Sequence, residues 1–151
     1  MLDSQGYDAG KKVTGRKRHI LVDTLGLLLS VVVHPADVQD RDGVKEVLRQ
    51  ARRSFPFIKR IFADAGYQGP KAAQAVTETG QWAMEIVKRT DVHKFVVVPK
   101  RWVVERTFAW TSRYRRLMRE FERYARTTAA FFRLAMIRLM LRRLTRSTHS
   151  I

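Results

Sequence analysis

The chain has 151 residues, 45% of them hydrophobic, so it is long enough for one domain with a buried core and too short for two. Thirty lysines and arginines against fourteen acidic residues give a net charge of +16, which favours a polyanionic partner such as nucleic acid. A structural RNA-binding protein has the same balance, so charge alone indicates no reaction. Cysteine is absent, which excludes disulfides and thiolate metal sites.

The positive charge is concentrated in the C-terminal third, where residues 99–151 contain fourteen basic and three acidic residues. No segment offers the ~20 uninterrupted apolar residues of a membrane span. The N-terminus lacks the basic-then-apolar order of a signal peptide. We therefore expect a soluble, cytoplasmic protein whose partner binds mainly to its C-terminal part.

The first third of the chain predicts an irregular arm followed by a hairpin. Residues 1–16 are polar and contain three glycines, which indicates an irregular arm. A strand is expected over 17–23, a tight turn at Leu25–Gly26, and a second, more apolar strand over 27–34. Pro35 should end the pairing of that strand.

The middle of the chain predicts alternating helices and strands. Acidic residues in 37–42 start a helix that Phe55–Pro56 ends. A short apolar strand over 58–63 delivers Asp64 at its carboxyl end. Glycines then turn the chain into a helix over 70–79.

The last third predicts two further strands, over 83–87 and 95–98, and then helices. A helical stripe begins after Lys100 and runs to Leu117, and Glu105 lies off this stripe. A final basic helix is expected over 125–144. Residues 100–146 thus form a set of basic C-terminal helices within a single domain that covers 1–151.

This order of elements is α/β, with an antiparallel hairpin ahead of βα units, and it predicts a mixed sheet flanked by helices. Function in such sheets gathers at the carboxyl ends of strands, where Asp64 falls. If the helix that carries Glu105 lies against that edge, the carboxylates can hold Mg²⁺ or Mn²⁺. Two such ions can activate a hydroxyl or water for attack on a phosphodiester.

Four segments carry a specific resemblance that extends over nearly the whole chain: Asp3-Ser4-Gln5, the run from Gly15 to Leu27, Ala63-Asp64-Ala65-Gly66-Tyr67, and the run from Arg101 to Trp110. They closely resemble the catalytic half of bacterial insertion-sequence DDE transposases of the insertion sequence five-like group. The resemblance implies a ribonuclease H-like fold and Mg²⁺-dependent cleavage of double-stranded DNA at insertion-sequence ends, with Mn²⁺ as a substitute. It also implies strand transfer by the freed 3′-hydroxyl, and hence a nucleoid-associated protein.

Residue roles follow from the resemblance, motif by motif. Asp3, Asp64 and Glu105 match the catalytic carboxylates, all three of them metal ligands. Arg101 matches the family's basic partner in the same helix as Glu105. The residues expected to contact DNA are Arg101, Tyr67, Arg106, Arg113, Arg115 and Arg116.

The chain also departs from the family pattern at its N-terminus. The first Asp of the family ends a hydrophobic strand at the centre of the sheet, whereas only Met1 and Leu2 precede Asp3. Gln5 meets Gly6 directly, which indicates an internal deletion. We therefore interpret the chain as truncated, with its first, central strand largely missing, and we predict marginal stability and a tendency to aggregate or oligomerise.

Two functions remain open from the sequence. One is a DDE-type transposase, a polynucleotidyl transferase; the alternative is a non-catalytic DNA-binding remnant of such an enzyme. An upstream reading-frame product that supplies the missing segment, and a homo-oligomer, are both compatible with the sequence.

Several residues also have simpler interpretations. Asp64 could cap the next helix, and Glu105 could pair with Arg101 at i,i+4. Trp102, Phe108 and Trp110 are expected in the core rather than as base-stacking surfaces. The remaining polar candidates are assigned structural roles or partly buried positions: Asp8, Asp23, Asp37, Asp40, Asp42, His19 and His34.

Overall fold

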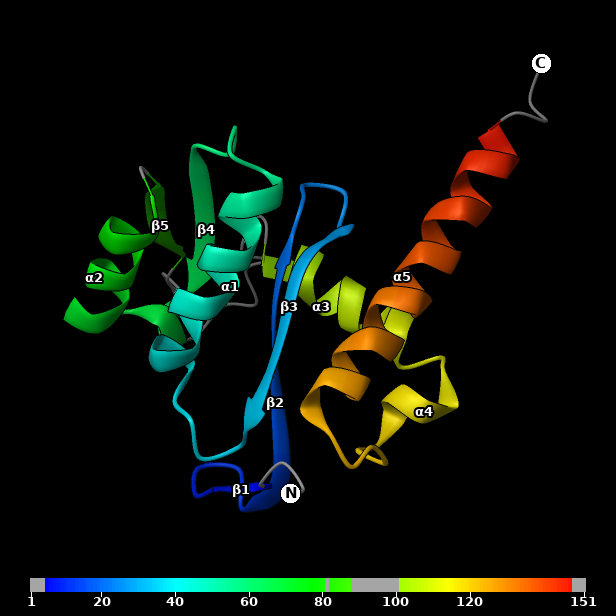
Figure 1. Cartoon of the computed structure of the whole chain (residues 1–151), viewed down its shortest axis with the longest axis horizontal. Helices are drawn as coiled ribbons and strands as arrows, with labels where there is room; N and C mark the ends of the chain where they lie inside the picture. The colour runs from blue at the N-terminus through cyan, green and yellow to red at the C-terminus, as the bar shows by residue number, and fades with distance from the viewer. Residues whose placement is uncertain (1–4, 81, 88–100, 148–151) are drawn as a thin grey trace, which may run out of the picture.

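The computed structural model describes residues 5–80, 82–87 and 101–147, and the side chains of Arg101 and Ser147 are not described. Figure 1 shows the arrangement of the elements. In chain order they are β1 (Gly6–Asp8), β2 (Val13–Val22), β3 (Leu28–Pro35), α1 (Asp40–Ser54), β4 (Arg60–Asp64), η1 (Ala65–Tyr67), α2 (Pro70–Thr79), β5 (Ala83–Val87), α3 (Arg101–Thr111), α4 (Arg115–Met118) and α5 (Ala125–Ser147).

The predicted hairpin is confirmed, because β2 and β3 pair antiparallel from Arg16 opposite Pro35 to Val22 opposite Leu28. Asp23 shapes the turn, since its Oδ1 accepts hydrogen bonds from Leu25 N and Leu27 N, both at 2.8 Å. A short Asx side chain that bonds the backbone ahead of it is a common device for closing a turn.

The prediction of an irregular arm over 1–16 is wrong for residues 6–8 and 13–16, which are strand. β1 pairs antiparallel with β2, and Gly6 lies opposite Gly15. The connection between them is stabilised by Asp8, whose Oδ1 accepts from Gly10 N at 3.0 Å and Lys11 N at 3.1 Å. Of the three glycines that indicated irregularity, only Gly10 lies in the turn, whereas Gly6 and Gly15 are paired residues of the two strands.

A second sheet contains β4 and β5, which pair parallel with Asp64 opposite Val87. The described strands thus form two separate sheets, one of three strands in the order β1-β2-β3 and one of two strands. The predicted α/β class is confirmed, and so is the position of Asp64 at the carboxyl end of its strand. The single mixed sheet is not found among the described strands, because the antiparallel hairpin and the parallel pair belong to different sheets.

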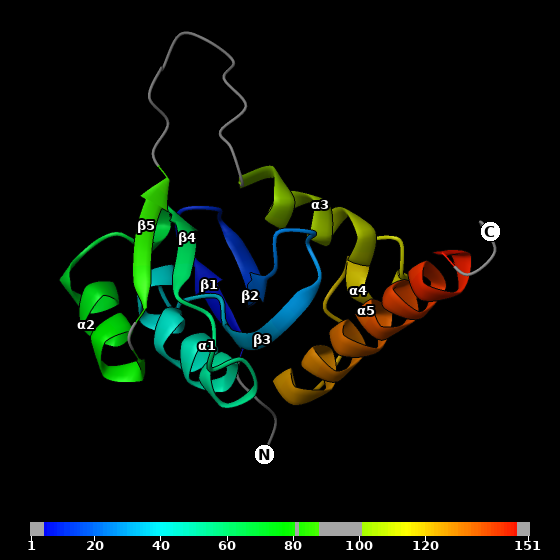
Figure 2. The ribbon, with the colours of Figure 1, turned by 90° about the horizontal axis from the view of Figure 1, so that it is seen from above.

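Two hydrophobic clusters hold these sheets. One packs α1 and α2 against β4 around Leu48, Ile61 and Ala72, and the other packs α4 and α5 against β3 around Val31 and Phe132. Figures 1 and 2 show α1 and α2 beside the β4–β5 sheet, with α5 on the far side of the β2–β3 hairpin. α1 also contacts both strands of the hairpin, so it links the two halves.

Predicted boundaries were most accurate in the middle of the chain. The expected ranges of α2 and β5 match the structure, and α1 begins at Asp40 and ends at Ser54, directly before Phe55. The continuous helix expected from Lys100 to Leu117 is wrong, because α3 ends at Thr111 and the short α4 begins at Arg115. The strand expected over 95–98 lies outside the described residues.

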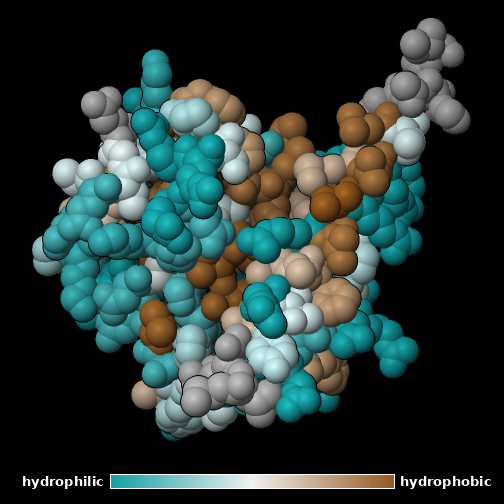
Figure 3. Space-filling model, in the orientation of Figure 1, coloured by the Kyte–Doolittle hydropathy of each residue, from teal (hydrophilic) through white to brown (hydrophobic). Residues whose placement is uncertain are grey.

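α5 carries an exposed apolar stripe, visible as brown along the arm at the upper right of Figure 3. The stripe comprises Leu134, Ile137, Leu141 and Leu144, which are 46–67% exposed. Among the helices that the structure describes, none has both the length and the hydrophobicity that crossing a membrane requires.

α3 is attached to the tip of the β2–β3 hairpin by two side chains. Thr107 Oγ1 donates to Gly26 O at 2.7 Å, and Arg106 Nη2 donates to Leu25 O at 2.9 Å. Gly26 has φ +80°, and a Cβ there would lie 2.9 Å from Thr107 Oγ1. The turn therefore requires glycine for both its backbone conformation and its close approach to α3.

The change Gly26→Ala is expected to destabilise the protein by at least ~1–2 kcal/mol, the usual cost of a left-handed non-glycine residue. The matched change is Gly15→Ala, because a Cβ at Gly15 meets nothing within 4 Å. Urea unfolding of both variants measures the difference. Equal free energies of unfolding would contradict the proposed attachment of the turn to α3.

Candidate active site

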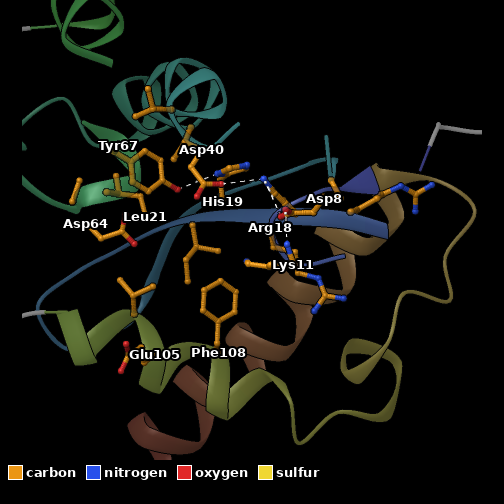
Figure 4. A pocket seen from close by; sticks show the side chains of 18 of the residues that line it. Asp8, Lys11, Arg18, His19, Leu21, Asp40, Asp64, Tyr67, Glu105 and Phe108 are labelled. Atoms are coloured by element: carbon orange, nitrogen blue, oxygen red, sulfur yellow. Dashed lines mark hydrogen bonds and ion pairs between the residues drawn. The ribbon is translucent and has the colours of Figure 1, made fainter. Parts of the chain in front are cut away.

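A cavity of about 760 Å³ lies between the two sheets, and its lining includes residues of β2 from Val13 to Leu21 and of β4 from Ile61 to Asp64. Figure 4 shows Asp64 and Glu105 toward one end of this cavity and Asp8 and Lys11 toward the other. Four carboxylates thus line one space together with Glu120: Asp8, Asp40, Asp64 and Glu105.

Asp64 is placed by the strand that precedes it. It is the last residue of β4 and is exposed, and its Oδ1 accepts from Gly66 N at 2.9 Å. It therefore does cap the following turn, η1, as the simpler interpretation anticipated. Capping occupies only one carboxylate oxygen, so the cap is compatible with a second role for Oδ2.

Glu105 enters the same cavity from α3. It is exposed, and its neighbour Val104 also lines the cavity. The hydrogen bonds from Arg106 and Thr107 to the hairpin tip position this turn of α3 relative to the β2–β3 hairpin. The structure thus brings together two of the three carboxylates singled out from the sequence, whereas Asp3 lies outside the described residues.

Asp40 is a carboxylate that the sequence assigned to structure and that lies next to Asp64. A Cβ built on Gly66 would be 3.0 Å from Asp40 Oδ2 and also 3.0 Å from Asp64 Oδ1, so the two carboxylates flank the same glycine. Lys17 Nζ lies 3.7 Å from Asp40 Oδ1. The sequence signal that could have identified Asp40 as a site residue was its position in the first turn of α1, the helix that follows β3.

The other competing carboxylates have structural partners. Asp8 and Asp23 close turns, and Asp42 pairs with Lys71 at 3.0 Å. Their predicted structural roles are confirmed.

A buried histidine of β2, His19, is part of the cavity lining. His19 is 3% exposed, and its Nδ1 lies 3.0 Å from Tyr67 Oη. α1 approaches closely here, since a Cβ on Gly43 would be 2.8 Å from His19 Nε2. Burial, followed by the nearby His34, lowers the pKa of His19 to about 4. Burial, together with Asp40 and Asp64, raises the pKa of Tyr67.

The lowered pKa of His19 predicts an acid-sensitive stability. In the unfolded chain its pKa is about 6.5, so the unfolded state binds more protons than the folded state between that value and about 4. Stability is therefore complete above about pH 6.5 and falls as the pH drops toward 4, by at most about 3 kcal/mol from this residue. Thermal melts from pH 7 to 4 measure the loss.

The control for that experiment is His19→Gln, which keeps a polar side chain without the titration. Because carboxylates also titrate in this range, the informative quantity is the difference between the two pH profiles. Parallel profiles for the two proteins would contradict the assignment to His19.

The residues expected to contact DNA occupy different settings. Arg106 lies between the rings of Trp102 and Trp110, at 4.1 and 4.9 Å. Tyr67 directs its hydroxyl to His19. Arg113 and Arg115 are exposed, whereas Arg116 pairs with Glu122 at 2.7 Å. Arg101 begins α3, and its side chain is not described.

The carboxylates that line the cavity are suitable ligands for a hard divalent cation. Within the described ranges no three His, Asp or Glu side chains group closely enough to hold a metal ion by themselves. Asp64 and Glu105 nonetheless line one cavity, and carboxylate oxygens are the ligands that Mg²⁺ and Mn²⁺ prefer.

Comparison with known proteins decides the family. Residues 2–140 match the family described as "Transposase DDE domain". The chain belongs to the DDE transposase family. Within 144 aligned residues it is 31% identical to a Burkholderia cepacia protein named "Putative transposase for insertion sequence element IS402", and the match covers 91% of this chain and 68% of that protein. No solved structure matches the chain.

Membership of the DDE transposase family confirms the resemblance inferred from the motifs. The matched range includes Asp3, Asp64 and Glu105, and also α3 and most of α5. The family implies DNA as the partner and a divalent metal ion as the usual cofactor.

Proposed function

We propose that the protein cleaves DNA strands at insertion-sequence ends and joins them to a target through the freed 3′-hydroxyl, in a reaction that depends on a divalent metal ion. The observation that carries this proposal is the convergence of Asp64 from β4 and Glu105 from α3 on one cavity in a member of the DDE transposase family. Asp64 and Glu105 belong to different elements that are far apart in the sequence, so only the fold can place both on the lining of one cavity.

In this proposal Asp3, Asp64 and Glu105 hold Mg²⁺, with Mn²⁺ as a substitute. A bound divalent ion would supply Lewis acidity for the activation of water or a hydroxyl and for the stabilisation of a leaving oxygen. Asp64 holds its carboxylate in place through its bond to Gly66 N, so one oxygen is oriented before any ligand binds. Exposure of Asp64 and Glu105 gives a DNA backbone access to both.

The basic surface serves as the DNA contact. The candidate contacts lie on elements near Asp64 and Glu105 in the sequence. Tyr67 ends η1, and the arginines lie on α3, on α4 or between them: Arg101, Arg106, Arg113, Arg115 and Arg116. Their proposed role is to position phosphates rather than to read bases, because guanidinium groups match phosphate oxygens regardless of sequence.

The test is nicking of supercoiled DNA by the purified full chain in Mg²⁺ or Mn²⁺, followed by a strand-transfer assay with a labelled 3′-hydroxyl end. Nicking that stops when the metal is chelated supports the enzyme. Absence of nicking at every protein and metal concentration, with intact binding of DNA, would overturn the catalytic proposal for this chain.

Duplex binding is expected to weaken steeply with salt, because each phosphate contact by Lys or Arg releases a counterion. For about six contacts, affinity should fall by roughly a thousandfold between 50 and 200 mM salt. Fluorescence anisotropy of a labelled duplex measures it. A flat salt dependence would contradict a phosphate-binding role for the arginines.

The second candidate is a non-catalytic DNA-binding remnant. It is favoured by the absence of a complete three-ligand group among the described residues and by the open cavity between the two sheets. On this alternative the salt dependence of DNA binding remains and nicking is absent.

A further inference from the structure

A hydrogen bond between two side chains joins the two sheets next to Asp64. His19 lies on β2, in the three-stranded sheet, and Tyr67 ends η1, the turn that follows β4. His19 Nδ1 and Tyr67 Oη lie 3.0 Å apart, and the two rings meet edge-on at a centroid distance of 6.2 Å. Figure 4 shows the Tyr67 hydroxyl directed from η1 toward His19. Since no backbone ladder joins the two sheets among the described strands, this bond links the two halves directly.

His19 is a fixed anchor for this bond. Its side chain is buried, at 3% exposed. A Cβ at Gly43 would lie 2.8–3.0 Å from three atoms of the His19 ring, so the backbone of α1 lies against that ring. From β3, the ring of His34 meets it edge-on at a centroid distance of 5.2 Å. Because close-packed neighbours on two sides restrict the imidazole, it has little freedom to move relative to β2.

Tyr67 and Asp64 belong to one compact turn. Asp64 caps η1 by accepting from Gly66 N at 2.9 Å, and Gln68 N donates to Ala65 O at 3.1 Å. A single 3₁₀ turn has poorer hydrogen-bond geometry than an α-helix, so it depends on tertiary contacts for its conformation. The contact that holds Tyr67 therefore also holds the turn that carries the Asp64 carboxylate.

The second carboxylate, Glu105, is bound to the same hairpin. Thr107 follows it by two residues on α3, and Thr107 Oγ1 donates to Gly26 O at 2.7 Å in the turn between β2 and β3. Asp64 is tied to that hairpin through Tyr67. The β2–β3 hairpin thus positions both carboxylates of the cavity.

We propose that His19 is a positioning residue, which holds the hydroxyl of Tyr67 and thereby places the Asp64 carboxylate in the cavity. The placement is relative to β2, and hence to Glu105, whose helix is bound to the same hairpin. The consequence for metal binding and strand cleavage rests on the proposed function, whereas the effect on the conformation of η1 does not. Removal of the partners that orient a metal ligand typically changes metal affinity or activity by roughly 10–100-fold.

The bond between His19 and Tyr67 joins two neutral groups at pH 7. Burial, followed by the nearby His34, lowers the pKa of His19 to about 4, and burial raises the pKa of Tyr67. A neutral imidazole nitrogen either donates to a phenol oxygen or accepts from it, so the pair can form one hydrogen bond in either tautomer. The bond therefore does not depend on a proton that titrates near neutral pH.

The first test follows the turn itself, in the full chain without DNA or metal. Tyr67→Phe removes only the hydroxyl, His19→Leu removes the ring nitrogens at a similar side-chain size, and His19→Asn keeps a polar atom at the position of Nδ1. The backbone order parameter of Gly66, from ¹⁵N relaxation, reports the turn that carries Asp64. It should be near the rigid value of about 0.85 in the unchanged chain, fall in Tyr67→Phe and His19→Leu, and recover in His19→Asn.

Tyr114→Phe is the matched control, since it removes a hydroxyl that donates to Ala135 O at 3.4 Å in the other hydrophobic cluster. It should leave the order parameter of Gly66 unchanged. Circular dichroism and urea unfolding first show which variants fold. If His19→Leu does not fold, Tyr67→Phe carries the test, because it introduces no new polar group and removes a single atom.

Nicking and duplex binding, measured on the same proteins, test the functional consequence. At saturating duplex and metal, Tyr67→Phe and His19→Leu should nick DNA roughly 10–100-fold more slowly with unchanged duplex affinity, and His19→Asn should restore most of the rate. The double variant Tyr67→Phe with His19→Leu should be no slower than His19→Leu alone, because both changes remove the same bond.

An unchanged order parameter of Gly66 in Tyr67→Phe, or an equal loss in Tyr114→Phe, would overturn the positioning role. Weaker duplex binding by Tyr67→Phe with an unaltered nicking rate at saturation would also overturn it, by assigning the hydroxyl to a phosphate contact. Additive slowing in the double variant would do the same, since independent effects do not share one bond. If Gly66 responds as expected in a chain that never nicks DNA, the proposed function fails and the placement of Asp64 by His19 stands, so the two failures are distinguishable.

Discussion

Replacing Asp64 with asparagine is expected to abolish metal-dependent nicking while leaving duplex binding unchanged. Asparagine keeps an oxygen that can accept the hydrogen bond from Gly66 N, so the cap of η1 is retained. It removes the negative charge that would hold the metal ion. Since metal catalysis contributes several kcal/mol and about 4 kcal/mol corresponds to roughly a thousandfold in rate, nicking should fall below detection.

Asp42→Asn is the matched control, because Asp42 pairs with Lys71 and does not line the cavity. Nicking rates and duplex anisotropy are measured on the same preparations of the two variants and the unchanged chain. Nicking that survives Asp64→Asn comes from another carboxylate or from a contaminating nuclease, and in either case the role given to Asp64 fails.

The change Phe132→Ala is expected to destabilise the protein by about 3–5 kcal/mol, the usual cost of truncating a buried aromatic residue. Phe132 is 0% exposed, and its ring packs edge-on against Phe108 at a centroid distance of 6.1 Å. It joins α5 to α3 within the second cluster. Against a total stability of about 5–15 kcal/mol, this loss is enough to unfold a marginal domain.

The control on the same helix is Leu134→Ala, since Leu134 is 59% exposed and should change stability by no more than about 0.5 kcal/mol. Chemical denaturation of the two variants at neutral pH gives both free energies. If the Phe132→Ala variant does not fold, the milder change Phe132→Leu replaces it in the comparison with Leu134→Ala, and its loss of stability should be smaller. Similar stability of Phe132→Ala and Leu134→Ala would mean that α5 does not pack as described.

Local signals allowed much of the fold to be predicted from the sequence. The turn at Asp23 to Gly26, the strand that ends at Asp64, and the α2 range are each set by residues within a few positions, so they were predicted closely. The break between α3 and α4 was missed because the apolar stripe continues through Tyr114 to Leu117, and only the packing against α5 shows where the helix ends.

The site was predicted only in part, for a different reason. Asp64 and Glu105 were singled out because the motifs around them resemble a family, and the structure places both on one cavity. Asp40 looked like an ordinary helix-start residue, because its proximity to Asp64 depends on how α1 packs against η1. β1 was missed because three polar residues that pair at a hairpin have no hydrophobic period to reveal them.

The attachment of α3 to the hairpin tip divides the two proposed ligands between separate bodies. Glu105 is held to the three-stranded sheet through Thr107 and Gly26, whereas Asp64 belongs to the two-stranded sheet. No backbone ladder between described strands sets their separation, which depends instead on how α1 spans the two halves. Small rotations of one half against the other would change the distance between the Asp64 and Glu105 carboxylates directly. Anything that bridges β2 and β4 would therefore also set the ligand spacing available to bound metal ions.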